Sequence, residues 1–242
     1  MSLANYRPRT VGEIVDASAT FYRAHFATVI TVAMLIVVPP AIAKMFVPVW
    51  AGRIVDFIGN ILILIAQGAI AAMVAAAVEH SAELNVGQAF RSTKGRIGSL
   101  IAVQLASGLM VGIGLILLIV PGIIAIAWTA VCVPVVMIEQ VGYSKAIDRS
   151  GALARGRWRK ILGTMVLAWG VAFLVLLGAS VVLGMFVTNG LIGDLAIDII
   201  IGFVLPVPAI TTTLLYYDLR VRTESADLDA MLATLPPSAP AV

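Results

Sequence analysis

Long uncharged segments alternate with short charged segments along the chain. A helix needs about 20 mostly apolar residues to cross the hydrocarbon core of a bilayer, which is about 30 Å thick. The segments without Asp, Glu, Lys or Arg are Ala24–Ala43, Phe57–Val78, Ile97–Ile138, Ile161–Gly193 and Ile199–Tyr217. We expect one span in each except Ile97–Ile138, with a turn at Thr188-Asn189-Gly190 closing the fourth segment.

Ile97–Ile138 is about twice as long as one span and contains Pro121-Gly122, a strong signal for a turn and a helix end. It therefore predicts a hairpin of two helices, about 98–119 and 123–138. The predicted spans are roughly 26–47, 57–78, 98–119, 123–139, 161–186 and 195–217. The fold class that follows is all-α, a six-helix transmembrane bundle built from three hairpins.

Amphipathic segments precede the spans at 10–25, 85–96 and 142–160. In the first segment apolar residues recur at helical spacing, and Thr10 with Glu13 forms a capping-box pattern. We expect three interfacial helices on one side of the membrane. One interfacial helix followed by a two-span hairpin is then a unit that the chain uses three times.

Three regions follow from this pattern: an N-terminal segment with an amphipathic helix (1–25), the six-span domain (26–217) and a tail (218–242). The beginning of the tail is polar and suits a surface helix. Pro236-Pro237-Ser238-Ala239-Pro240 cannot continue a helix, so we expect the end to be disordered.

Composition agrees with a membrane protein. The chain of 242 residues is 61% hydrophobic and 12% charged, whereas a soluble domain carries roughly 25% charged residues. So few charges could not cover so much apolar surface in water, and a disordered chain would be far more polar. The single cysteine, Cys132, excludes an internal disulfide and lies in an apolar run, where we expect a buried, inert thiol.

The sparse positive charges are sorted along the chain. Of the 16 Lys and Arg residues, Lys44 and Arg53 follow the first span, and the other 14 lie in the alternate connections and the termini. The positive-inside rule then places both termini in the cytoplasm of a bacterial cell, with the spans in the inner membrane. This sorting explains the net charge of +3, so we expect no nucleic-acid partner.

A basic cluster begins the fifth span. It consists of Arg155, Arg157, Trp158, Arg159 and Lys160. One interpretation is a topology signal with an interfacial aromatic anchor. The other is a patch that binds the headgroups of anionic lipids, since each such cation contributes about 1 kcal/mol near an anionic surface.

Uncharged polar residues lie inside the predicted spans, and no charged residue lies deep within them. The polar residues are Asn60, Gln67, Gln104, Thr129 and Thr211-Thr212-Thr213. The lack of charge disfavours ion-coupled transport, which needs ionisable groups at membrane depth. The polar groups either bond between helices or line a path for a solute, with Asn60, Gln67, Gln104 and Thr211 as candidate cavity residues.

Prolines and small residues also mark the spans. The prolines are Pro39-Pro40, Pro121, Pro134, Pro206 and Pro208. They kink or break helices, which shapes bundles and can also line transporter sites. The Gly108–Gly112 motif suits close helix packing within the chain or between chains.

No arrangement of residues points to catalysis. The two histidines, His25 and His80, adjoin different spans, and no P-loop or HExxH pattern is present. Glu79, His80 and Glu83 are the only candidate metal ligands that the sequence brings together. We expect no enzyme activity, no metal and no cofactor.

Several short motifs occur in order along the chain. They are Arg7-Pro8-Arg9-Thr10-Val11-Gly12-Glu13-Ile14, Val120-Pro121-Gly122-Ile123-Ile124, Pro134–Glu139, Ala146-Ile147-Asp148-Arg149-Ser150, Arg155-Gly156-Arg157-Trp158 and Tyr216–Glu224. Together they resemble the bacterial membrane-domain family found fused to some glycerophosphodiester phosphodiesterases, and its stand-alone relatives. The resemblance implies a polytopic helical membrane protein. We expect no phosphodiesterase activity, because nothing here is similar to the catalytic barrel or its acidic metal cluster.

Two functions remain open. The first is a non-enzymatic scaffold or lipid-interacting subunit that acts with membrane lipids and with a membrane-protein partner or as a homo-oligomer. The second is a transporter or permease component for a neutral or amphiphilic solute. A cavity that reaches Gln67, Gln104 or the Thr211–Thr213 turn would favour the second.

Overall fold

The computed structural model describes residues 9–79, 82, 85–187 and 190–233. Within them the chain forms eleven α-helices and no strand. The helices are α1 (Val11–Ala24), α2 (Phe26–Lys44), α3 (Val49–Glu79), α4 (Val86–Thr93), α5 (Ile97–Leu117), α6 (Ile119–Thr129), α7 (Cys132–Ile138), α8 (Tyr143–Ala154), α9 (Trp158–Phe186), α10 (Gly190–Val204) and α11 (Pro206–Ala233).

Six stretches of helix in this part of the chain are long and apolar enough to cross a bilayer. They are Phe26–Lys44, Trp50–Glu79, Ile97–Leu117, Ile119–Ile138, Trp158–Phe186 and Gly190–Glu224. The predicted all-α class with six spans is confirmed. Together with the composition, these helices indicate a multi-pass membrane protein.

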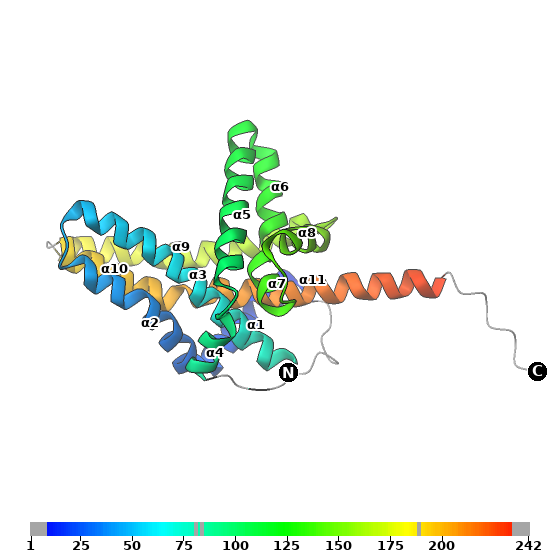
Figure 1. The fold of residues 1–242 in the computed structure, drawn as a ribbon, viewed down its shortest axis with the longest axis horizontal. Coiled ribbons are helices and arrows are strands. Elements are labelled where there is room, and N and C mark those ends of the chain that lie inside the picture. The colour runs from blue at the N-terminus through cyan, green and yellow to red at the C-terminus, as the bar shows by residue number, and fades with distance from the viewer. Residues whose placement is uncertain (1–8, 80–81, 83–84, 188–189, 234–242) are drawn as a thin grey trace, which may run out of the picture.

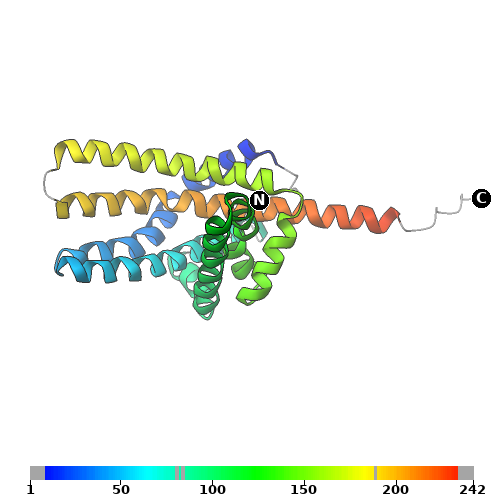
Figure 2. The same ribbon diagram turned by 90° about the horizontal axis from the view of Figure 1, so that it is seen from above.

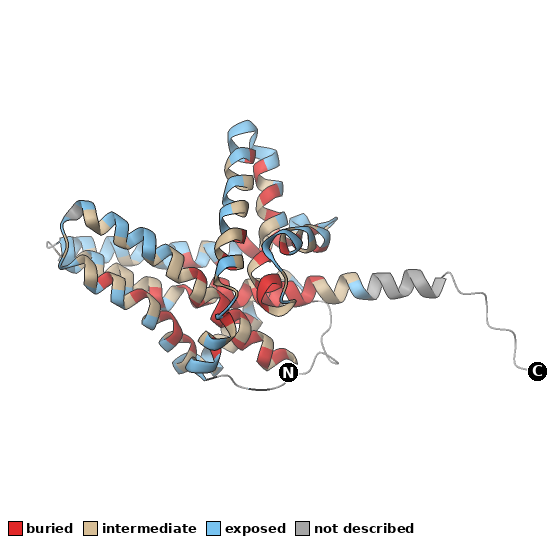
Figure 3. Cartoon of the chain, in the orientation of Figure 1, coloured by how far each residue is buried: buried red, intermediate tan, exposed pale blue. Residues whose placement is uncertain are grey.

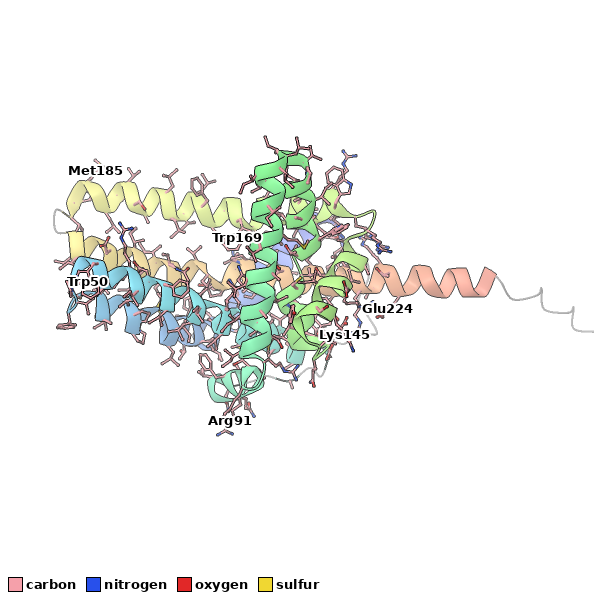
Figure 4. The ribbon with its side chains drawn as sticks, turned by 45° about the horizontal axis from the view of Figure 1, so that its top comes forward. Trp50, Arg91, Lys145, Trp169, Met185 and Glu224 are labelled. Carbon is pink, nitrogen blue, oxygen red and sulfur yellow. The ribbon has the colours of Figure 1, made fainter. Side chains whose placement is uncertain are left out.

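The helices form a bundle with one hairpin across it. Helices α2, α3, α9 and α10 run side by side, with α10 between α2 and α9. Trp50 and Met185 mark the same end of this bundle (Figure 4). The α5–α6 hairpin projects from the side, crosswise to the other spans, as Figures 1 and 2 both show. Helix α11 continues the line of the bundle away from the end marked by Trp50.

The turn of the α5–α6 hairpin lies earlier than predicted. Leu118 alone is extended between the helices, with φ −162° and ψ 145°. Pro121 lies in the first turn of α6, where its missing N–H leaves no hydrogen bond unmade. Gly122 provides close approach of the two helices, because a Cβ atom there would lie 2.8 Å from the backbone N of Leu115. Pro121-Gly122, which the sequence indicates as a turn, therefore lies inside α6 and allows α5 and α6 to pack closely.

Two predicted spans are broken helices. The fourth, predicted as one helix over 123–139, divides into α6 and α7 at Ala130–Val131, ahead of Pro134. The sixth divides into α10 and α11 at Leu205, ahead of Pro206. A proline ring clashes with the carbonyl four residues before it and cannot donate a backbone hydrogen bond, which accounts for both breaks. Pro39-Pro40, in contrast, lies inside an unbroken α2.

Helix α11 passes the expected end of the membrane domain without a break. It runs through Tyr217, so the predicted tail begins as a continuation of the same helix. The predicted turn residues Thr188 and Asn189, and the proline-rich end at 236–240, lie outside the described residues.

The three predicted amphipathic helices are present as α1, α4 and α8, and their buried faces correspond. Aligned from their N-caps, Ile14, Ala89 and Ala146 occupy one position, and all three are fully buried. Thr10 with Glu13 forms the predicted capping box, and Asn85 with Gln88 forms a second one at the corresponding position. This agreement supports three repeated units: unit 1 (α1–α3), unit 2 (α4–α7) and unit 3 (α8–α11).

A carboxylate lies at the end of the last span in each unit, and all three meet α11. The hydroxyl of Tyr217 donates to Glu79 Oε1 of unit 1, and that of Tyr216 donates to Glu139 Oε1 of unit 2, both at 2.9 Å. The third acid is Asp218 itself. Figure 3 shows buried residues gathered in this region, where α3, α7 and α11 pack together.

Asp218 is fully buried, and its carboxylate binds three groups. Its Oδ1 accepts a hydrogen bond from the backbone N of Arg9 at 2.6 Å, and its Oδ2 accepts from Arg222 Nε at 2.9 Å and from Lys160 Nζ. Lys160 and Arg222 also donate to the carbonyl of Arg9, at 2.5 and 2.8 Å. Asp218 thus ties the segment before α1 and the start of α9 to α11.

Candidate ligand-binding cavity

A cavity of about 320 Å³ lies where the three repeated units meet. We call it the central cavity. Unit 1 contributes Gln67 from α3, and unit 2 contributes Gln104 from α5 with part of α6 and α7. Unit 3 contributes Trp169 from α9 and Thr212 from α11. In Figure 4, Trp169 lies where α9 passes the α5–α6 hairpin. The α5–α6 hairpin therefore forms one wall of the central cavity, and the bundle forms the other.

The threonine hydroxyls of the central cavity are already bonded. Thr129 donates to the carbonyl of Ala125 at 2.9 Å, and Thr212 and Thr213 donate to that of Ala209 at 3.0 and 2.8 Å. Such bonds to the preceding turn leave the oxygen lone pairs available as acceptors.

Three other polar groups are available to a ligand. The amides of Gln67 and Gln104 make no hydrogen bond with any described residue, and each offers two donors and an acceptor. Ser107 Oγ is buried near the Cys132 thiol with no hydrogen-bond partner in the described chain. Since buried polar atoms are normally paired, the unpaired Ser107 Oγ marks a part of the cavity suited to a polar ligand atom. The partly buried Gln67 and the exposed Gln104 add donors and acceptors to the same cavity.

The remaining lining is apolar and uncharged. It includes Val103, Val111, Ile126, Met165 and Trp169, and no Asp, Glu, Lys or Arg among the described residues. Apolar walls with a few convergent polar groups are the usual composition of a site for a small organic ligand. This lining suits a molecule with an apolar body and an uncharged polar group.

Both helix breaks lie beside the central cavity. Thr129, Ala130 and Cys132 line it at the break between α6 and α7, and Pro208 lines it just after the break between α10 and α11. Broken helices at the interface of repeated units form the binding sites of many transporters, because the breaks free backbone groups for a ligand.

The structure brings together two of the four candidate cavity residues, Gln67 and Gln104. Asn60 lies in another cavity of about 240 Å³ between α2, α3 and α10, where its side chain donates to the carbonyl of Asp56 at 2.9 Å. Thr211 is buried, bonds to the carbonyl of Val207 at 2.8 Å and does not line the central cavity.

The cavity that contains Asn60 also holds an ion pair. Lys44 Nζ lies 2.6 Å from Asp198 Oδ2 and 3.0 Å from Asp56 Oδ1. The ion pair joins α2, α3 and α10 toward the end of the bundle marked by Trp50. Asp198, which lies inside α10, is therefore balanced by the lysine that ends α2.

The basic cluster of the fifth span divides into two groups. Arg157 donates to Thr223 Oγ1 at 2.9 Å and to the carbonyl of Arg222 at 3.1 Å, and Lys160 binds Asp218. Arg155, Trp158 and Arg159 are exposed. Two of the five predicted headgroup contacts thus hold the protein together, and the other three face outward.

The structure bears on the predictions about Cys132 and about the candidate metal ligands. Cys132 is buried and unpaired with any other cysteine, as expected. No group of three His, Cys, Asp or Glu residues with metal-binding geometry occurs in the described chain. Glu79 contacts Tyr217, and His80 and Glu83 lie outside the described residues.

Comparisons with protein families, curated proteins and solved structures found no match to this chain. Sequence reasoning missed Ser107 and Trp169. Ser107 had a readable signal, because it lies three residues after Gln104 and so shares a helix face with it.

Proposed function

We propose that this protein is a multi-pass inner-membrane protein of bacteria that binds an uncharged or amphiphilic solute in the central cavity, as a permease component. The observation that carries the proposal is the convergence of three units on one cavity containing Gln67 and Gln104. Of the two functions considered from the sequence, solute binding is the one that uses this cavity.

The size and opening of the cavity fit a small amphiphile. Its volume of about 320 Å³ falls at the lower end of the range of roughly 300–1,000 Å³ that is usual for ligand pockets. Gln104 and Gly108 are exposed, and Trp169 is 49% exposed, so the cavity opens sideways between α5 and α9. A solute dissolved in the bilayer could enter by this side, and its apolar part would contact Trp169.

The absence of ionisable groups from the described lining supports a solute without formal charge. A charged ligand would lose its hydration without gaining an opposite charge, which costs several kcal/mol. An uncharged group bonded to both glutamine amides avoids this penalty. We further propose that the protein acts by binding and not by catalysis.

The cavity proposal predicts labelling by an uncharged amphiphile. We expect a monoacylglycerol with a diazirine in its acyl chain, added to proteoliposomes, to crosslink at Met165 and Trp169. Thr212→Phe fills the cavity and should reduce this labelling severalfold. Replacing Gln67 and Gln104 with leucine should raise the half-saturating concentration roughly fivefold to tenfold, because two hydrogen bonds of about 0.6 kcal/mol are lost.

Ser180→Phe provides the control, since Ser180 lies on the exposed surface of α9 and does not line the cavity. This variant should label like the wild type. Labelling spread evenly over the lipid-facing helices, unchanged by Thr212→Phe, would contradict the proposal.

The proposed orientation predicts the result of reporter fusions. With both termini cytoplasmic, alkaline phosphatase fused after Val187 should be active in the periplasm, because 14 of the 16 cations would lie on the opposite side. Green fluorescent protein fused after Arg157 should fluoresce in the cytoplasm. The reverse pattern of activities would overturn the orientation.

A further inference from the structure

The structure contains the same basic connection twice. Lys94-Gly95-Arg96 joins α4 to α5, and Arg155-Gly156-Arg157 joins α8 to α9. The central glycines have positive φ, 90° and 70°, and each connection makes the same two backbone hydrogen bonds to the end of the preceding helix. Positive φ favours glycine, so both connections depend on it for the same reversal of direction.

The cations of the two connections have different partners. Arg157 in unit 3 is bound to α11 through Thr223 and the carbonyl of Arg222. In unit 2, the side chain of Arg96 makes one hydrogen bond within the described residues, from Nη1 to the carbonyl of Val136 at 3.2 Å. The side chain of Lys94 is exposed and makes no hydrogen bond or ion pair with the residues that the structure describes. In unit 2 both cations of the connection remain available to an outside partner, whereas in unit 3 only the exposed Arg155 does.

These cations line a mainly polar hollow of about 330 Å³, which we call the Lys94 hollow. Its other side chains are Ser99 on α5 and Gln140 beside α8, and the segment up to Gly142 completes it. The sides of the hollow therefore offer two positive charges, a hydroxyl and an amide. No carboxylate lines it within the described residues.

The acid next to the hollow in the chain, Glu139, is engaged elsewhere. Glu139, directly before Gln140 in the chain, accepts hydrogen bonds from Arg149 Nε at 2.8 Å and from Tyr216 at 2.9 Å. It therefore does not balance the charge of Lys94 and Arg96. The Lys94 hollow keeps a net positive charge that an anion could neutralise.

The starts of two helices add hydrogen-bond donors to this charge. Helix α5 begins after Arg96 and α8 begins after Gly142, and neither N-cap residue bonds the helix N–H groups through its side chain, as far as the chain is described. In contrast, α1 and α4 are closed by capping boxes. Uncapped N–H groups and the positive end of the helix dipole favour an anion, especially a phosphate.

We propose that the Lys94 hollow binds the phosphate group of an anionic phospholipid. The lipid source follows from the position of the hollow at the start of an apolar span. Leu105 and Leu109, further along α5, are 62% and 65% exposed and offer an apolar surface for acyl chains. The hollow also lies on the side that carries most of the cations, where the leaflet is rich in anionic headgroups. This site is separate from the central cavity.

Lipid titration of the detergent-purified full chain, followed by native mass spectrometry, tests the site. Phosphatidylglycerol should bind more tightly than phosphatidylcholine of equal chain length. Lys94→Gln with Arg96→Gln should weaken phosphatidylglycerol binding about thirtyfold, since each cation contributes about 1 kcal/mol. Lys94→Gln alone removes no internal hydrogen bond and should weaken it about fivefold.

The matched control is Arg91→Gln with Lys145→Gln, which removes the same charges from exposed positions outside the hollow (Figure 4). We expect less than a threefold change for this pair. The proposal is overturned if the control pair weakens binding as much as the hollow variants, or if both lipids bind equally. Competition by inorganic phosphate without any retained phosphatidylglycerol would overturn the lipid assignment.

Discussion

Replacement of Asp218 with asparagine should destabilise the protein by about 3 kcal/mol. The carboxylate is fully buried and bonds Lys160, Arg222 and the backbone of Arg9. Asparagine has nearly the same shape but no charge, so Lys160, which is 18% exposed, would lose the charge that balances it. Removal of one partner from a buried ion pair typically costs 3–5 kcal/mol, far more than the pair contributes at a surface.

The single cysteine provides the measurement. Cys132 is 2% exposed, so a fluorescent maleimide should label it only after the protein opens. Labelling during a titration with sodium dodecyl sulfate then gives the free energy of unfolding in micelles. Asp16→Asn, at an exposed position of α1, is the control and should change it by less than about 0.5 kcal/mol. Equal stability of the Asp218 and Asp16 variants would show that the buried network is not stabilising.

Replacement of Gly122 with alanine should cost about 1–3 kcal/mol by forcing apart the α5–α6 hairpin. The new Cβ would lie 2.8 Å from the backbone N of Leu115, and one at Gly114 would lie 2.9 Å from the Cα of Gly122. Backbone cannot yield as a flexible side chain can, so the helices must separate. The same titration measures the effect.

Gly112→Ala is the matched control on the same hairpin. A Cβ at Gly112 has no atom of the described chain within 4 Å, and alanine favours helix, so this change should be neutral or stabilising. A loss at Gly112 as large as that at Gly122 would mean that helix geometry, and not contact between α5 and α6, determines the result.

The sequence predicts the helices better than their arrangement. Spans and capping boxes depend on local properties, such as the length of an apolar segment or the spacing of Thr10 and Glu13. The α5–α6 hairpin is hydrophobic on all sides, so its composition could not show that it crosses the bundle. The close approach of Gly114 to Gly122 could not be predicted either, because a proline followed by a glycine normally indicates a turn.

The candidate site was predicted in part. Gln67 and Gln104 stood out as amides in apolar helices, and the structure places both in the central cavity. Asn60 had the same signal but lies in another cavity. The sequence does not show which part of α3 the helices of the other units pack against, so Asn60 and Gln67 could not be told apart. The role of Arg157 and Lys160 was hidden for a related reason. Their partners lie on α11, more than 50 residues away in the chain.

The bond between Arg9 and Asp218 joins positions 209 residues apart, and this separation dictates an order of assembly. During synthesis the first two units emerge from the ribosome before α11 exists. The hydrogen bonds of their final carboxylates, Glu79 and Glu139, to Tyr217 and Tyr216 can therefore form only after α11 has been made. Nascent chains that stop before Tyr216 lack all three of these contacts with α11. Helix α11, made after the first two units, thus fixes the segment that leads into α1.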